Sequence, residues 1–168
     1  MLEEEITTQL KFEISINKKD ICIALAHVQS IIERRNIIPI LSHVLMIADA
    51  NSLTLVSTDT DIIVSEKIAA HVEEAGEITI SAVVLYDIVR KLDDSDKISI
   101  KFDHTTSVAT ITSGNCKFSL STLPAKEFPR ADESSYESNL NISSKQLKEL
   151  IDKSKISISS EETRYNLH

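Results

Sequence analysis

The chain has little glycine, no tryptophan and few aromatic residues, and each shortage excludes a class of function. Its two glycines, Gly76 and Gly114, are far apart, whereas a glycine-rich phosphate loop needs several close together. With aromatic residues at 4%, a base-stacking platform for single-stranded nucleic acid has little material. The two cysteines, Cys22 and Cys116, have no Cys or His partner at metal-ligand spacing, so we expect both to pack as inert side chains and expect no cofactor.

Long apolar runs are also missing. None approaches the roughly 18 residues that span a bilayer, and the acidic start Met1–Glu5 lacks the positive region of a signal peptide. Hydrophobic residues at 42% and charged residues at 26% are typical of a chain that folds in water. We therefore expect a cytoplasmic protein with no membrane partner. The net charge of −8 argues against bulk attraction of phosphates.

One pattern starts three times along the chain, about sixty residues apart. An alternating apolar strand leads to a small polar residue that can cap a helix, and apolar residues at helical spacing follow. The candidate caps are Asn17, Ser81 and Ser143, and Gln146 completes a capping box with the third. Chance similarity of short amphipathic segments is the alternative explanation of this repeat.

Between the first two helices, and after the second, lie segments rich in Val, Ile, Leu and Thr with turn residues between them. The expected strands are His43–Ile47, Leu53–Ser57, Ile62–Ile68, Ile98–Phe102, Val108–Ile111 and Lys117–Leu120. Each unit therefore reads β-α-β-β-β, and two units form one α+β domain with antiparallel sheets and two helices.

The remaining segments complete the expected domain organisation. We assign residues 1–10 to an N-terminal extension and residues 11–132 to the domain. With Pro124 and Pro129 before it, the polar run Asp132–Asn139 resembles an inter-domain connection, with the linker itself at 133–139. A third unit, with a strand through Leu140 and Ile142, starts at residue 140, and we expect 140–168 to be the truncated start of a second domain.

Basic residues concentrate in the expected helices. The segments 17–35, 81–92 and 143–156 hold ten basic and five acidic residues, and the rest of the chain is strongly acidic. If these helices line one surface, that surface attracts phosphate while the outer sheets repel it, which suits a protein that surrounds a duplex without gripping it. The alternative is that Lys and Arg simply solvate the helices.

Two other functions stay open from the residues alone. Asp59 and Asp61 could hold Mg²⁺ for nuclease chemistry, but Asp and Thr are common turn residues, and we favour a turn at Asp59-Thr60-Asp61. A protein-interaction module that docks through the strand containing Phe118 is the third possibility. We find no further carboxylate or partner motif that would complete a catalytic site.

Two stretches resemble bacterial DNA polymerase III β clamps. Arg35–Leu41 is similar to the R-x-x-L-P-I-L segment of that family, and Ser113–Pro124 is similar to its S-G-x-x-x-F-S-L-S-T-L-P segment. The similarity covers Lys11–Asp132 and, more loosely, Leu140–Leu167. Val83, where the family often has a basic residue, and His168, where the R-Y-x-L-N-G pattern ends in glycine, depart from it.

The resemblance implies a non-catalytic, three-domain subunit that dimerises head to tail into a ring around duplex DNA and tethers the replicative polymerase. The fold it implies is a DNA clamp domain with helices on one concave face and antiparallel sheets outside. Its partners would be double-stranded DNA, the polymerase III catalytic subunit, the clamp loader and a second copy of itself.

Site residues follow from the resemblance and from the basic helices. The resemblance places Arg35 on DNA, Lys117, Phe118 and Leu120 on the edge strand at the subunit interface, and Arg164 and Leu167 at the rim of the pocket for partner peptides. To the DNA-binding set the helices add Arg34, Arg90, Lys91, Lys145 and Lys148.

Overall fold

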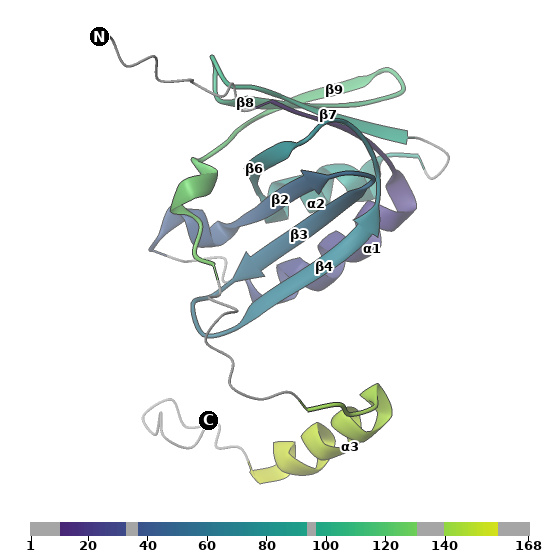
Figure 1. Cartoon of the computed structure of the whole chain (residues 1–168), viewed down its shortest axis with the longest axis vertical. Coiled ribbons are helices and arrows are strands. Elements are labelled where there is room, and N and C mark those ends of the chain that lie inside the picture. Colours follow the sequence, from purple (N-terminus) through teal and green to yellow (C-terminus); the bar gives the residue numbers. More distant parts are fainter. Residues whose placement is uncertain (1–10, 33–36, 94–96, 131–139, 158–168) are drawn as a thin grey trace, which may run out of the picture. The chain divides into compact units, whose positions relative to one another are not determined.

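The computed structural model describes residues 11–32, 37–93, 97–130 and 140–157. The chain folds as two compact units, Met1–Ala131 and Asp132–His168 (Figure 1). No helix in the described ranges is long and apolar enough to cross a membrane.

In its described residues the first unit contains nine strands, two α-helices and three short 3₁₀ turns. In chain order they are β1 (Phe12–Asn17), α1 (Lys18–Val28), η1 (Gln29–Ile31), η2 (Pro39–Ser42), β2 (His43–Asp49), β3 (Ser52–Thr58), β4 (Ile63–Ala69), β5 (His71–Glu74), β6 (Gly76–Ser81), α2 (Ala82–Lys91), β7 (Lys97–Asp103), β8 (Val108–Ser113), β9 (Cys116–Ser121) and η3 (Ala125–Glu127). The second unit contains α3 (Ser144–Ser154) and η5 (Lys155–Ser157).

The two repeat units exchange their first strands. One sheet has the order β5-β1-β7-β8-β9 and the other β4-β3-β2-β6. Strand β1 therefore pairs with β7 and joins the sheet of the second unit, and β6 pairs with β2 and joins the sheet of the first. All pairs are antiparallel, with Phe12 opposite Phe102 and Met46 opposite Ile78. The α+β repeat predicted from the sequence is confirmed, whereas β5, which pairs with β1, was not predicted.

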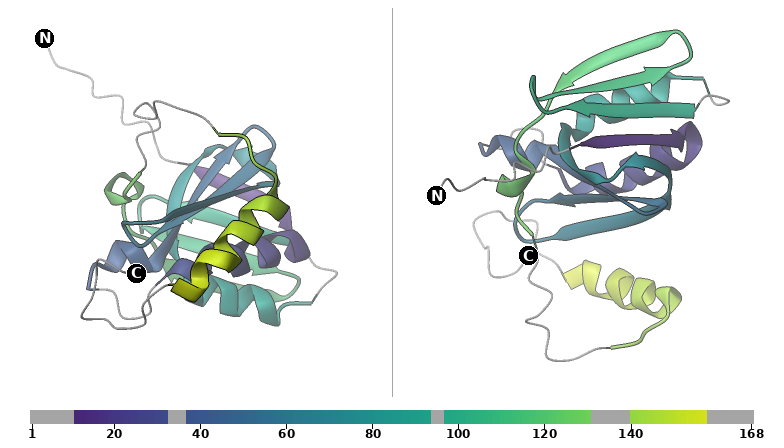
Figure 2. Two further views of the ribbon diagram at one scale, coloured as in Figure 1. Left: turned by 90° about the horizontal axis from the view of Figure 1, so that it is seen from below. Right: turned by 45° about the horizontal axis from the view of Figure 1, so that its top comes forward.

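Both sheets and both helices of the first unit enclose one core. Alternate residues of β1 point inward (Phe12, Ile14 and Ile16), and α1 and α2 bury one stripe each. The two helices pack against each other (Figure 2). Because residues from strands of both units meet helices of both units here, neither unit can bury its apolar face without the other.

The predicted caps behave differently from one another. Asn17 Oδ1 accepts from the Lys19 backbone N–H at 2.9 Å, and Ser143 forms the expected capping box with Gln146, whereas Ser81 makes no side-chain cap bond. Helix α1 ends at Val28 rather than continuing to residue 35. The hydroxyls of Ser57 and Ser30 donate to the last carbonyls, those of Val28 and His27, which end the helical pattern.

The stretch around Pro124 and Pro129 belongs to the first unit, where Phe128 is buried against Ile40, Leu41 and Leu45. One expectation about the chain after β9 was wrong. No strand forms at residues 140–142. A strand needs a hydrogen-bonded neighbour, and within the described residues of the second unit there is only helix.

Gly76, at the start of β6, lies directly against the backbone of Lys11, which precedes β1. A Cβ added there would lie 2.0 Å from the carbonyl oxygen of Lys11. That atom belongs to the backbone at the start of β1 and cannot rotate away, so the β5–β6 connection and the start of β1 fit together only with glycine at this place.

We expect Gly76→Ala to lower the free energy of unfolding by about 1–3 kcal/mol through overpacking, measured by urea unfolding. The neighbouring exposed Ala75 gives the control, since Ala75→Ser should change stability by less than about 0.5 kcal/mol. Equal, small effects of both substitutions would contradict the close contact.

Candidate nucleic-acid interface

Two of the predicted DNA-binding residues lie at the end of α2. Arg90 and Lys91 are exposed in its last turn, where cations interact favourably with the helix dipole. Arg90 is partly oriented by its own helix: Nη2 lies 3.4 Å from Asp87 Oδ1, and the guanidinium carbon lies 5.7 Å from the centre of the Tyr86 ring. An exposed pair of this kind is weak, so Arg90 can exchange Asp87 for a phosphate.

Helix α1 contributes less positive charge than the sequence suggested. Lys19 is exposed, but Lys18 is buried and Asp20 lies in the first turn. Arg34 and Arg35 lie outside the described residues. With the observed bounds, the three α-helices hold seven basic and four acidic residues, so the basic bias is present but smaller than in the predicted segments.

Lys145 and Lys148 are exposed on α3 in the second unit. Lys148 forms an ion pair with Asp152 one turn further along the helix. The apolar side chains Leu147, Leu150 and Ile151 on the same helix are also exposed, between 46% and 57%. Whether these lysines share a surface with Arg90 and Lys91 stays a prediction.

The 3₁₀ turn η2, which follows Arg35 in the chain, is held by apolar packing and by hydrogen bonds. Ile40 and Leu41 are buried with Leu45 and Phe128, whereas Ile37 is 96% exposed. Pro39 begins η2, and its carbonyl oxygen accepts from Ser42 Oγ at 2.6 Å and from His43 Nδ1 at 3.1 Å. The P-I-L part of the family-like motif is therefore held on the first unit by both packing and hydrogen bonds.

Strand β9 is an edge of the five-stranded sheet among the described strands. It pairs with β8 on one side only, with Phe118 opposite Ile111 and Leu120 opposite Ala109. Phe118 and Leu120 pack partly on the core, and Lys117 is exposed. An edge leaves alternate backbone groups available for another strand, which is the property that an interface through β9 requires.

The described structure bears on Asp59 and Asp61 but not on the predicted peptide-pocket residues. Arg164 and Leu167 lie outside the described residues. Asp59 Oδ1 accepts from the backbone N–H groups of Asp61 and Ile62, at 3.0 and 2.7 Å, so its carboxylate holds the β3–β4 turn. Within the described ranges, no group of three or more His, Cys, Asp or Glu side chains could hold a metal ion.

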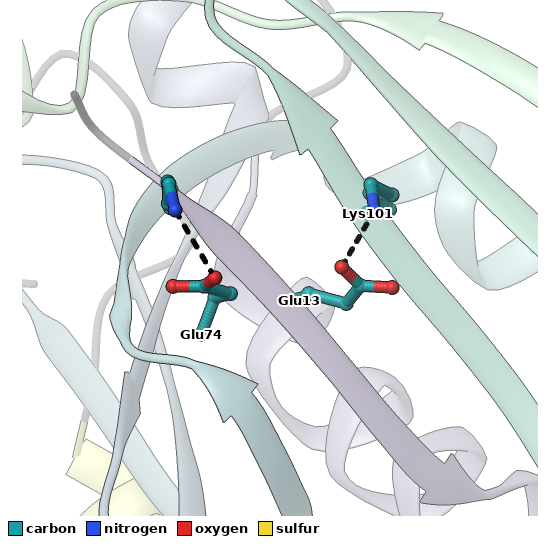
Figure 3. Close-up of polar contacts among 4 residues, drawn as sticks. Glu13, Glu74 and Lys101 are labelled. Atoms are coloured by element: carbon teal, nitrogen blue, oxygen red, sulfur yellow. Dashed lines mark hydrogen bonds and ion pairs between the residues drawn. The ribbon is translucent and has the colours of Figure 1, made fainter.

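A row of ion pairs on the five-stranded sheet was missed by the sequence reading. Lys101 of β7 lies 2.7 Å from Glu13 of β1, and Lys11 lies 3.3 Å from Glu74 of β5 (Figure 3). The hydrogen bond and charge of Glu13 raise the pKa of Lys101. Glu13 alternates with buried neighbours in β1, so its face was predictable, but its partners depend on the exchange of strands.

Comparisons with known proteins identify the family. Residues 12–132 match the model of the DNA polymerase III beta subunit, N-terminal domain. The chain belongs to this family. It is 38% identical over 156 residues to a beta sliding clamp of Caulobacter vibrioides, and 31% identical over 155 residues to that of Pseudomonas aeruginosa. These matches cover 93% and 92% of the chain.

Solved structures agree with the family assignment. A crystal structure of the C. crescentus beta sliding clamp matches with a TM-score of 0.88 at 38% identity, over 94% of the chain and 42% of that structure. A sliding clamp of Bartonella birtlesii bound to griselimycin matches with a TM-score of 0.87 at 39% identity, over 92% of the chain and 41% of that structure. The chain spans 42% of the length of both curated relatives. The predicted α+β clamp domain is thus confirmed.

Because His43 binds the Pro39 carbonyl of η2, we expect the free energy of unfolding to depend on pH. Burial lowers the pKa of His43 below 6.5, although the bond to Pro39 opposes the shift. The unfolded chain therefore binds a proton more readily than the native state, and stability falls as the pH drops through about 6.5. His43→Asn, which keeps a donor near Pro39, should lose less stability than the wild type between pH 7.5 and 5.5 in urea unfolding. Parallel losses would rule out His43 as a source of the acid sensitivity.

Proposed function

We propose that this chain supplies the first domain of a DNA sliding clamp, which as a full-length ring dimer encircles duplex DNA and tethers the replicative polymerase for processive synthesis. The family match over residues 12–132 carries this proposal. The two-fold repeat of the first unit supports it, because a domain built from two equivalent halves suits a ring made of repeated arcs.

In this proposal retention on DNA is topological. A net charge of −8 opposes tight association with a polyanion, so the protein cannot depend on many strong phosphate contacts. A few mobile contacts on the inner helices would orient the duplex and still permit sliding. Arg35, Arg34, Arg90, Lys91, Lys145 and Lys148 are the residues that we assign to these contacts.

The proposal also assigns partners and surfaces. Lys117, Phe118 and Leu120 form the strand edge that pairs with a second copy, and Arg164 and Leu167 rim the pocket that takes peptides of the polymerase catalytic subunit and the clamp loader. The protein acts in the cytoplasm, where the chromosome is replicated, and catalyses no reaction itself. The turn role of Asp59 favours this over the nuclease alternative.

Topological retention predicts a difference between closed and open DNA. After loading, the full-length protein should stay on nicked circular DNA when salt is raised from 50 to 500 mM, but leave linear DNA of the same sequence at least about tenfold faster, because weak phosphate contacts are lost with salt. Gel filtration of labelled DNA with the bound protein measures the retained fraction.

The 168-residue chain by itself provides the control for that experiment, because it should be retained on neither circular nor linear DNA. Equal loss of the full-length protein from the circle and from linear DNA would refute encirclement.

The proposed interface predicts an effect of charge on dimerisation. Lys117 is an exposed cation on β9, the strand edge to which the proposal assigns the interface. Lys117→Glu should raise the dimer dissociation constant of the full-length protein about tenfold, as measured by analytical ultracentrifugation. The matched change Lys19→Glu, at an exposed position of α1, should leave dimerisation unchanged. An unaltered dimer with Lys117→Glu would remove this residue from the interface.

A further inference from the structure

A pocket opens in the first unit where β6, β7 and the segment after β9 meet. Its volume is about 390 Å³, and its apolar lining consists of Ile78, Phe102, Leu123, Pro124 and Ala125. That volume lies within the range of sites that bind small molecules. The proposed function leaves this pocket unused, because none of its lining residues is among those assigned to DNA, to the second copy or to partner peptides.

Hydrogen bonds fix one wall of the pocket. The side-chain hydroxyl of Thr79 donates to the Leu123 carbonyl at 2.8 Å and accepts from the Leu123 N–H at 3.0 Å. One residue earlier, the N–H and the hydroxyl of Thr122 both donate to the Ser107 carbonyl, each at 3.0 Å. A wall held in this way needs little ordering when a ligand binds, so the entropic cost of binding is low.

The acidic side chain in the lining is already paired. Glu77 is bound by both ends of the Arg130 guanidinium, with Nη1 3.1 Å from Oε1 and Nη2 2.5 Å from Oε2. Bidentate pairs of this kind are the strong form of the arginine–carboxylate contact. Because Arg130 occupies both oxygens, the charge of Glu77 is balanced and this carboxylate is not available to a cationic ligand.

The remaining charge in the lining is positive. Lys126 lines the pocket and is exposed, and within the described part of the chain it forms no ion pair. His104 also lines the pocket and can donate a hydrogen bond from its ring. The acidic residues next to them in sequence, Asp103 and Glu127, are exposed but are not part of the lining. Asp103 Oδ1 instead accepts from the N–H and the hydroxyl of Thr105, at 2.9 and 2.6 Å.

We propose that this pocket binds a small amphipathic carboxylate. The apolar body of the ligand packs against Ile78, Phe102 and Leu123, and its carboxylate binds Lys126 at the rim. An apolar floor with a few placed polar groups is the usual composition of a small-molecule site. Charge complementarity with Lys126 selects an anion over a cation.

The surroundings of the pocket favour a small molecule over a macromolecule. Asp103, Glu127 and Arg130 are exposed beside its lining residues, whereas the core of a protein interface is depleted of charged residues. A nucleic-acid strand is disfavoured because the carboxylates of Asp103 and Glu127 repel its phosphates.

Titration of the 168-residue chain with 2-naphthoate, followed by heteronuclear NMR, tests the site. This carboxylate should bind with a Kd of about 1 mM or tighter, as expected for a ligand of its size, and should shift the amide signals of Leu123, Ala125 and Lys126. The uncharged isostere 2-naphthamide should bind at least about fivefold more weakly, because it lacks the charge-assisted contact. Equal binding of the acid and the amide, or unchanged pocket signals with both, would overturn the proposal.

Substitution of the rim cation gives an independent readout. Lys126→Gln should weaken the binding of 2-naphthoate about fivefold and leave that of 2-naphthamide unchanged. The matched change Lys67→Gln, at an exposed position of β4, should alter neither. Binding that maps to the exposed apolar residues of α3 would refute the pocket as the site. Pocket signals that shift with protein concentration alone would assign it to a second copy of the chain and refute a small-molecule role.

Discussion

The pairing of β1 with β7, and of β6 with β2, is the constraint on which the rest of the first unit depends. Each repeat unit gives its first strand to the sheet of the other, so the buried faces of both sheets and both helices close over a single core. Removing either pairing would expose the apolar faces of both units at once. The basic end of α2, the edge at β9 and the anchored P-I-L segment are all held in place through this shared core.

The pairing of β1 with β7 also gives the five-stranded sheet one apolar face and one charged face. Alternation along β1 and β7 sends Phe12, Ile100 and their neighbours inward, and presents Glu13 and Lys101 as an ion pair on the opposite face. Exposed pairs contribute little to stability, so the core carries the fold and the charged surface is free to vary. In a clamp, such a division lets the surface serve solubility and interfaces without a cost to packing.

Helix and strand positions were predictable because their signals are local. The period-two pattern of β1, the cap at Asn17 and the capping box at Ser143 each depend on residues within a few positions of one another. The end of α1 was not predictable, because hydroxyls of Ser57 and Ser30 bind its last carbonyls, and Ser57 comes from β3. Likewise the contact of Phe128 with Ile40 and Leu41 joins segments that are far apart in the chain.

By itself the sequence determined the repeat of two β-α-β-β-β units, the basic bias of its helices and the family resemblance carried by Arg35–Leu41 and Ser113–Pro124, since all of these are patterns along the chain. Only the tertiary structure decided which strands pair, that Ser57 binds the end of α1 and that Gly76 meets Lys11. These depend on contacts between residues far apart in sequence, and such contacts form only when the shared apolar core closes.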